Sequence, residues 1–321
     1  MGRHLLNHLI QQKSYDKIIN LDLNPPAEGF EGDDTVHYLN CDLRKPVDAK
    51  QLSDLGCDEH SVIYNLAAIC RIPGFPDRDY FETNILGAEH TVQLAEDLNF
   101  KSIVFTSSIA PYGASEELKT EESIPMPDNP YGSSKLVAEY VHKAWWQRDK
   151  EHRNLTILRP GIIFGAHEQA NFTRLYKSLK KGYFVYPGRK DTKKACVYVK
   201  DVARACLHFA EQKGGCQLFN LVYQHPPTIE KICELITKHT DAGKAKFTIP
   251  GPLLVTAAYG IKMIGGITGR SLSGIHPDRV KKVMISTNVS GSKLGNSTFE
   301  IKYQLDEAII DWYQECGETL F

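Results

Sequence analysis

The stretch Tyr131-Gly132-Ser133-Ser134-Lys135 decides the fold prediction for this chain. Tyr131 and Lys135 are four residues apart, so they lie on one face of a helix if the stretch is helical. Asn129 and Pro130 come just before it and predict that a helix starts there. An ammonium beside a phenol lowers the pKa of the phenol. The stretch therefore predicts a proton-transfer site that works near neutral pH.

An apolar run at 102–106 comes upstream of this helix and ends at two serines, of which Ser108 is the second. A serine hydroxyl at the end of a strand can hold a substrate oxygen beside the phenol. We therefore predict Tyr131, Lys135 and Ser108 as the catalytic residues of a site that oxidises an alcohol or reduces a ketone.

Short apolar runs alternate with helical patterns through most of the chain. Strands are predicted at 17–22, 35–39, 62–66, 102–106, 155–159 and 217–222, and helices near 3–12, 80–98, 131–149 and 200–212. This alternation favours an α/β fold with a doubly wound parallel (Rossmann-like) sheet. After about residue 223 the pattern becomes helical and irregular, which predicts a smaller mixed C-terminal part.

Four ordered runs carry a family resemblance: Thr106 to Gly113, Asn129 to Glu139, Leu158 to Gly165 and Val197 to Ala205. They resemble the extended short-chain dehydrogenase/reductases, the NAD-dependent epimerase/dehydratase family, and most closely its nucleotide-sugar epimerases. The resemblance implies an NAD-binding domain over 1–165, to which 196–225 returns, and a substrate-binding domain over 166–195 and 226–321.

A dinucleotide fold needs a first strand and a glycine-rich turn before its first helix. Neither is found here, and Gly2 looks like the last glycine of that turn. Two explanations are open: an N-terminally shortened enzyme, or a natural variant that has lost normal cofactor binding. The intact Ser108, Tyr131 and Lys135 favour the first. Asp22 ends the next strand and favours NAD over NADP. Either explanation predicts weakened NAD binding.

The resemblance also implies positions for the ligands. Besides Gly2, Asp22, Tyr131 and Lys135, the cofactor is expected at Asp42, Leu43, Leu66, Ala67, Ala68, Asn84, Ser107, Pro160 and Ile163. The substrate is expected at Ser108, Asn171, Lys194 and Arg279.

The leading functional hypothesis is C4 epimerisation of a nucleotide sugar through a transient 4-keto intermediate. Dehydratases of the superfamily carry Asp-Glu after the catalytic serine or threonine, and Ile109-Ala110 stand there instead. Two alternatives remain open. One is a dehydrogenase or ketoreductase of a keto-sugar nucleotide or a 3β-hydroxysteroid-like substrate; the other is a non-catalytic member with a defective cofactor site.

Composition restricts the partners. The formal net charge is −1, which gives no general attraction to nucleic acid. The eight cysteines form no Cys-x-x-Cys pair and no zinc spacing is found, so we expect reduced thiols, a cytoplasmic protein and no metal. The apolar stretch 249–268 is expected to be a packed helix rather than a membrane segment. The resemblance implies a homodimer formed through helices 80–98 and 131–149. The apolar stripe with Trp145 and Trp146 fits this, and an ordinary core-facing helix would show the same stripe.

Overall fold

The computed structural model describes residues 1–25, 30, 34–71, 74–212, 215–254, 256 and 284–317. Helices of these residues are α1 (Gly2–Gln12), α2 (Ala49–Asp54), α3 (Asp77–Asp97), η1 (Ala110–Tyr112), α4 (Pro130–Gln147), α5 (Asn171–Lys180), α6 (Val199–Ala210), α7 (Ile229–His239), α10 (Ser292–Gly295) and α11 (Leu305–Cys316). Their strands are β1 (Ile18–Asp22), β2 (Val36–Asn40), β3 (Val62–Asn65), β4 (Ser102–Thr106), β5 (Ser115–Lys119), β6 (Asn154–Pro160), β7 (Ile162–Phe164), β8 (Tyr186–Pro187), β9 (Cys196–Tyr198), β10 (Cys216–Leu221), β11 (Thr248–Ile249) and β12 (Thr287–Val289).

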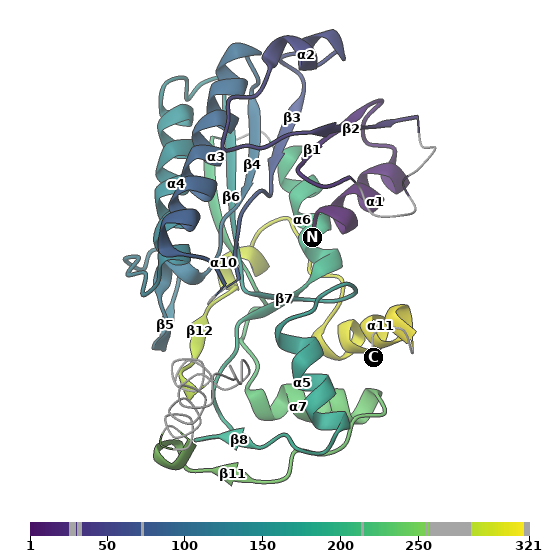
Figure 1. The fold of residues 1–321 in the computed structure, drawn as a ribbon, viewed down its shortest axis with the longest axis vertical. Helices are drawn as coiled ribbons and strands as arrows, with labels where there is room; N and C mark the ends of the chain where they lie inside the picture. Colours follow the sequence, from purple (N-terminus) through teal and green to yellow (C-terminus); the bar gives the residue numbers. More distant parts are fainter. Residues whose placement is uncertain are drawn as a thin grey trace, which may run out of the picture.

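The central sheet has the strand order β10-β6-β4-β3, and all its pairs are parallel. Helices α3 and α4 cover one face and α6 covers the other, as Figure 1 shows. Side chains of a strand alternate between the two faces. Ile103 and Phe105 therefore join the core under α3 and α4, and Val104 joins the core under α6. The predicted doubly wound α/β fold is confirmed.

The predicted elements agree with the structure to within a few residues at their ends. The apolar stripe of α4 fits both a dimer surface and a core-facing helix. Its Trp145 is 0% exposed and packs into the core between α4 and the sheet. An apolar stripe on a helix marks the face that is buried, and it does not say whether the same chain or another one covers it. The exposed apolar side chains of this helix pair are instead Phe81, Val137 and Tyr140.

Strands β1 and β2 form a separate parallel pair, which is not hydrogen-bonded to the central sheet. In Figure 1 this pair lies with α1 to one side of β3. A cavity of about 830 Å³ lies here, and residues along the whole length of β1 and of β3 line it. The doubly wound sheet of the described residues is thus interrupted between β1 and β3.

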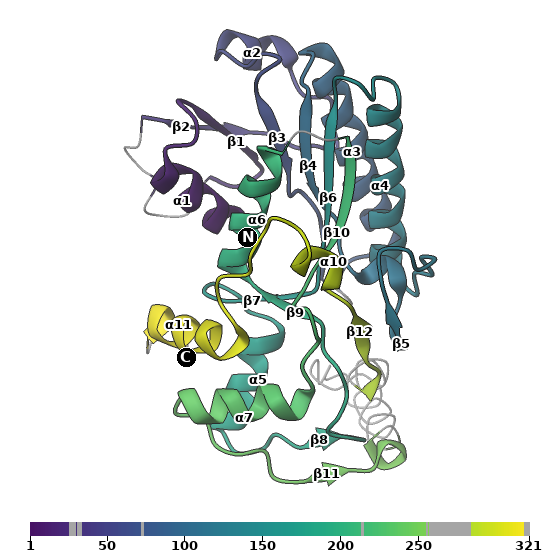
Figure 2. The ribbon, with the colours of Figure 1, turned by 180° about the vertical axis from the view of Figure 1, so that it is seen from behind.

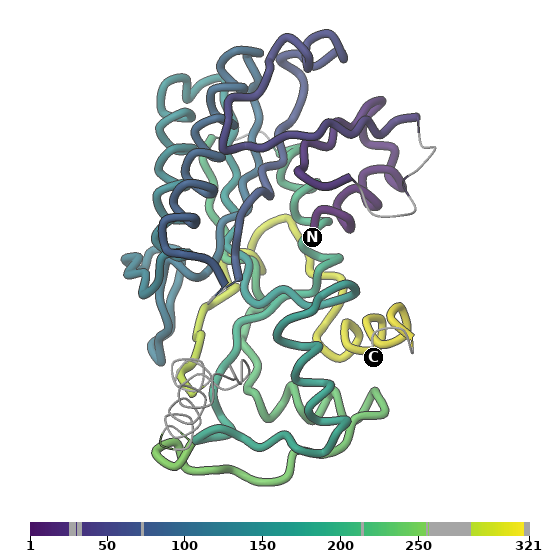
Figure 3. Tube along the Cα trace, in the orientation of Figure 1, coloured from purple at the N-terminus to yellow at the C-terminus, as the bar shows by residue number. Residues whose placement is uncertain are grey.

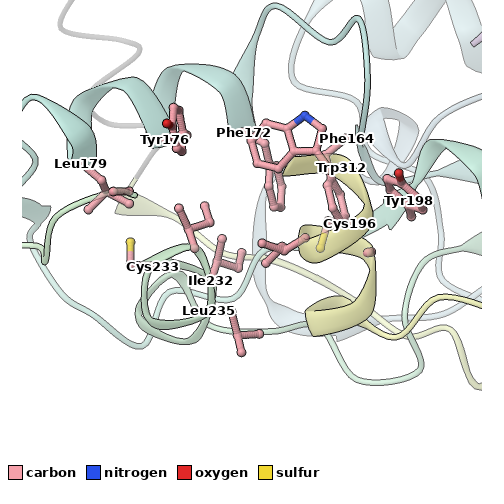
Figure 4. Packing of buried hydrophobic residues seen from close by; sticks show 14 of the residues in the cluster. Phe164, Phe172, Tyr176, Leu179, Cys196, Tyr198, Ile232, Cys233, Leu235 and Trp312 are labelled. Carbon is pink, nitrogen blue, oxygen red and sulfur yellow. The ribbon is translucent and has the colours of Figure 1, made fainter. Parts of the chain in front are cut away.

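A second core lies beyond the carboxyl ends of the sheet strands, where Figure 2 shows α5, α7 and α11 close together. Its centre is aromatic, with Phe164 stacked on Phe172 at 4.1 Å and Trp312 edge-on to both (Figure 4). The tube in Figure 3 shows how the chain returns to this region after β10. Among the described residues, no helix has the length and apolar character to cross a membrane; most of the stretch 249–268 lies outside them.

Candidate active site

The loop after β4 and the start of α4 meet at the carboxyl end of the sheet. The backbone N–H of Ser107 donates to Leu158 O at 2.7 Å, and that of Ile109 donates to Pro160 O at 3.1 Å. These bonds extend the pairing of β4 with β6 past the end of β4. The Ser108 hydroxyl accepts from the Ala110 N–H at 3.1 Å. The loop that carries Ser108 is therefore held by hydrogen bonds to β6 and by one hydrogen bond within the loop.

Helix α4 begins as the sequence predicts. The Asn129 side chain accepts a hydrogen bond from the Gly132 N–H at 3.0 Å, and Pro130 occupies the first turn. Gly132 lies against the loop after β4, since a Cβ on it would be 2.6 Å from Ala110 O. This close approach brings Tyr131 next to the serine loop.

The Ser108 hydroxyl lies close enough to the Tyr131 phenol to act on its pKa. Burial raises the pKa of Tyr131 to about 12, because a phenolate is poorly solvated there, and the Ser108 hydroxyl acts in the opposite direction. The sequence predicted instead that Lys135 lowers this pKa. In the structure the Lys135 ammonium lies over the Phe105 ring, 4.1 Å from its centroid. The protein alone therefore keeps Tyr131 protonated at neutral pH.

Lys135 is 1% exposed. Burial lowers the pKa of its ammonium to about 7, and the charge of Glu139, one turn further along α4, raises it again. The His142 ring also stacks on the Phe105 ring, with 4.1 Å between the centroids. Lys135 thus sits at the border between charged and neutral at the pH at which the predicted chemistry runs.

Glu139 is a member of the site that sequence reasoning missed. It is 0% exposed and accepts a hydrogen bond of 2.5 Å from the Ser107 hydroxyl. The Arg159 guanidinium, 3% exposed, donates two more, at 2.8 and 2.6 Å. The available signal was its place four residues after Lys135 on the same helix. That spacing alone does not distinguish a buried carboxylate from one that lies in solvent.

The predicted cofactor positions divide into two groups. Five of them line the cavity between β1 and β3: Gly2, Asp22, Leu43, Leu66 and Ala67. A Cβ on Gly2 would meet no atom within 4 Å, so the backbone at the start of α1 borders open space. The Asp22 carboxylate accepts from the Asn24 N–H at 2.9 Å.

The other predicted cofactor residues are not among those that line this cavity. Asp42 forms an ion pair of 2.6 Å with Arg44, which lowers the pKa of its carboxyl to about 2. Asn84 donates to Ser134 Oγ at 2.8 Å and to Ile69 O at 3.2 Å, so it ties the loop after β3, which includes Ala68, to α4.

Three further positions belong to this second group. The Ser107 hydroxyl donates a hydrogen bond to the Glu139 carboxylate. Pro160 ends β6, and Ile163 lies in the middle of β7. Both are at the carboxyl end of the sheet, on the side of the Ser108 loop.

Besides Ser108, the structure describes two of the predicted substrate positions, Asn171 and Lys194. Asn171 is exposed at the first residue of α5. Lys194 is 9% exposed, its ammonium donates to Ile285 O at 2.8 Å, and burial lowers its pKa to about 8. The hydrogen bond to Ile285 O is a structural contact of Lys194 that the sequence did not predict. Arg279 lies outside the described residues. In the described part of the chain, no group of three metal-ligating side chains is found.

The chain is similar to known proteins in sequence and in fold. The model of the NAD dependent epimerase/dehydratase family matches residues 1–221. A protein of Escherichia coli O157:H7 named N-acetyl-alpha-D-glucosaminyl-diphospho-ditrans,octacis-undecaprenol 4-epimerase is 27% identical over 76% of this chain and 74% of its own length. A decarboxylating sterol-4-alpha-carboxylate 3-dehydrogenase of Candida albicans is 24% identical over 88% of this chain and 85% of its own.

Among solved structures, UDP-glucuronic acid 4-epimerase from Bacillus cereus, in complex with UDP-glucuronic acid and NAD, superimposes with a TM-score of 0.74. It is 18% identical, and the match covers 100% of this chain and 96% of the other. At that identity the likeness establishes the fold.

Proposed function

The chain belongs to the NAD dependent epimerase/dehydratase family, and we propose that it is a 4-epimerase of a sugar carried on a diphosphate, in the first place a nucleotide sugar. The observation that carries this proposal is the contact between the Tyr131 phenol and Ser108, with Lys135 buried one turn along the same helix. These three groups are what a site needs to move a proton to and from a secondary alcohol.

NAD fits the residues around the cavity. The N-terminus of α1, at Met1, Gly2 and Arg3, borders the same space as the ends of β1 and β3. Backbone N–H groups at a helix N-terminus attract a pyrophosphate, and Asp22 would accept the ribose hydroxyls. When bound, NAD supplies the acceptor and later the donor of the hydride at sugar carbon 4.

Side chains of this protein would transfer the proton of the sugar hydroxyl. Tyr131, as phenolate, would take the proton of the sugar 4-hydroxyl, and Ser108 would hold the same oxygen by a hydrogen bond. Oxidation at carbon 4 gives the transient 4-keto intermediate, and Tyr131 returns its proton to the oxygen when reduction occurs on the other face. A Tyr131 pKa of about 12 is too high for this step at neutral pH. A positive charge brought near the phenol, from Lys135 or from the oxidised nicotinamide, lowers it.

Substrate choice is the finer part of the proposal. The E. coli relative acts, by its name, on a sugar joined through a diphosphate to undecaprenol, and the B. cereus structure holds a UDP-sugar. A sugar on a diphosphate is common to both. The two carriers differ, one being a nucleoside and the other a polyprenol.

The experiment is an epimerisation assay on purified protein with NAD. UDP-glucose, UDP-N-acetylglucosamine, UDP-glucuronic acid and a polyprenyl-diphosphate N-acetylglucosamine are incubated separately, and the products are separated by chromatography. The proposal predicts the 4-epimer of at least one substrate with no net formation of NADH. Release of NADH in step with product contradicts it.

That outcome would favour the second candidate, a dehydrogenase of a sugar or sterol-like alcohol. The similarity to the C. albicans sterol dehydrogenase extends over 88% of this chain, further than that to the E. coli epimerase. The same three groups, Tyr131, Lys135 and Ser108, would then serve a single oxidation, and NAD would be consumed in proportion to product.

Two accessory proposals remain. We propose a homodimer that buries the apolar side chains Phe81, Val137 and Tyr140 on the outer surface of α3 and α4. We also propose a cytoplasmic location, which the eight free cysteines favour. Sedimentation of the protein, with Tyr140→Glu as the variant that should become monomeric, tests the first.

A further inference from the structure

The segments that follow α5 and α7 lie side by side. The Lys246 N–H donates to Phe184 O at 3.3 Å, and Lys180 forms an ion pair of 2.8 Å with Asp241. These contacts lead into the parallel pairing of β8 with β11. In Figures 1 and 2 both strands lie at one end of the molecule, and α2 lies at the other. The two segments are therefore neighbours at an end of the molecule.

Positive charge is concentrated at this end. Residues 166–195 and 226–256, which include α5, α7, β8 and β11, contain twelve lysines and arginines and five acidic residues. The whole chain has 38 lysines and arginines and 39 acidic residues. The rest of the chain therefore has an excess of negative charge, which the net charge of −1 conceals. An anionic partner attracts this end of the molecule and repels the rest, so it orients the protein.

Four exposed lysines of these segments carry charges that no carboxylate balances. Lys177 and Lys181 are four residues apart at the end of α5, so their side chains lie on one face. Lys244 and Lys246 are exposed in the neighbouring segment. Among the side chains that the structure describes, none forms an ion pair with these four, whereas lysines close to them do.

Two aromatic side chains are exposed beside these lysines. Tyr183 is 61% exposed and Phe247 is 57% exposed. Tyr183 follows Lys181 by two residues, and Phe247 comes directly after Lys246. Apolar surface gains free energy when it leaves water. The combination of rings and unbalanced ammonium groups therefore fits a partner that offers both apolar and negatively charged groups.

An anionic lipid bilayer offers both kinds of group. Its headgroups attract clustered lysines, and aromatic rings favour the boundary between headgroups and acyl chains. An ammonium is a compact charge that needs no fixed partner geometry, which suits a fluid layer. A single-stranded nucleic acid is bound along a basic groove, whereas these cations stand on a helix end and a turn. The bilayer is therefore the partner that the surface favours.

We propose that this end of the molecule has a docking surface for an anionic lipid bilayer, formed by Lys177, Lys181, Tyr183, Lys244, Lys246 and Phe247. The ammonium groups meet lipid phosphates, and the two rings enter the boundary with the acyl chains. The docking is peripheral and reversible. It does not depend on the proposed epimerase chemistry.

The probe is a vesicle of equimolar phosphatidylcholine and phosphatidylglycerol, with which the purified chain is sedimented. The surface predicts binding to these vesicles, release by salt and much weaker binding to phosphatidylcholine alone. Lys181→Gln combined with Lys244→Gln should weaken binding by about tenfold or more. The matched control, Lys45→Gln with Lys50→Gln, removes the same charge at exposed positions before and in α2, and it should leave binding unchanged.

The aromatic part of the surface is tested without a change of charge. Phe247→Ser should weaken binding to the anionic vesicles by about fivefold. Leu118→Ser on β5, where the side chain is 55% exposed, is the matched control and should have no effect. Thermal midpoints of the variants show whether each one is folded.

Three results overturn the proposal: no binding to the anionic vesicles, equal loss of binding in the two lysine pairs, or unchanged binding of Phe247→Ser. A single-stranded oligonucleotide is tested in parallel. If the oligonucleotide binds through Lys181 and Lys244 and the vesicles do not bind, the surface is a nucleic-acid interface and the proposal is wrong.

Discussion

The Arg159 guanidinium donates two hydrogen bonds to the Glu139 carboxylate, at 2.8 and 2.6 Å, inside the core between β6 and α4. Arg159 also lies 4.6 Å from the Tyr112 ring centroid. Since Glu139 binds the Ser107 hydroxyl and is one turn from Lys135, this ion pair connects the serine loop, the central sheet and the catalytic helix. Its geometry is fixed by partners from three elements.

Replacement of Glu139 by Gln should destabilise the fold. Arg159 would keep its charge with no carboxylate to balance it, and a broken buried ion pair costs about 3–5 kcal/mol. The free energy of unfolding, measured with urea, checks this. The matched control is Glu117→Gln, whose side chain is 84% exposed; it should leave the midpoint unchanged. Equal effects of the two substitutions would contradict the buried pair.

The Arg159–Glu139 ion pair also shows what could not be predicted from the sequence. Local patterns predicted the start of α4, since Asn129 and Pro130 determine it within a few residues. They also predicted that Tyr131 lies near Ser108, because Ser108 follows the end of a strand and Tyr131 is in the first turn of the helix. They did not predict Glu139, because its partner Arg159 is brought to it only by the packing of β6 under α4.

Long-range burial explains the other differences. The resemblance implied that Lys194 contacts the substrate, and the structure adds a hydrogen bond from its ammonium to Ile285 O, in a segment 91 residues away. The stripe that contains Trp145 fitted either a dimer surface or the core, and the core covers this residue. A lysine occurs both in ligand sites and in structural contacts, and a tryptophan occurs both at interfaces and in cores. The residue type therefore does not tell these environments apart, and only the tertiary fold does.

The ammonium of Lys135 should make stability depend on pH. Its pKa is lowered to about 7 in the ligand-free protein, from an ordinary value of 10.5. Between these values the unfolded chain binds the additional proton, so stability rises with pH across that window, and the cost of burying the charge is greatest below pH 7. Lys135→Met removes this cost.

The variant should therefore be more stable than the natural sequence at pH 6. Its advantage should shrink by up to about 1.4 kcal/mol for each pH unit from 7 toward 10. Unfolding free energies of both proteins across this range provide the measurement. Lys177→Met, whose side chain is exposed on α5, is the control and should show no such trend. A constant difference between Lys135→Met and the natural chain would mean that Lys135 keeps an ordinary pKa.

Gly132→Ala should reduce turnover more than it reduces stability. The added methyl would be 2.6 Å from Ala110 O, so α4 must move away from the loop that carries Ser108. A misplacement of about 1 Å in a catalytic group can cost on the order of 100-fold in rate. Turnover with NAD and the thermal midpoint are compared with those of Gly295→Ala, where the nearest atom to the methyl would be 3.7 Å away, an ordinary van der Waals distance. Full activity of Gly132→Ala would show that this approach does not position Tyr131.

The most direct test of the proton-transfer site is the turnover of Tyr131→Phe with NAD and the substrate identified in the epimerisation assay. The substitution removes one oxygen and keeps the ring, so the fold should be retained. We predict that turnover falls by a factor of about 100 to 10,000, while binding of NAD is little changed. Turnover close to that of the natural chain would contradict the assignment of Tyr131 as the group that takes and returns the proton.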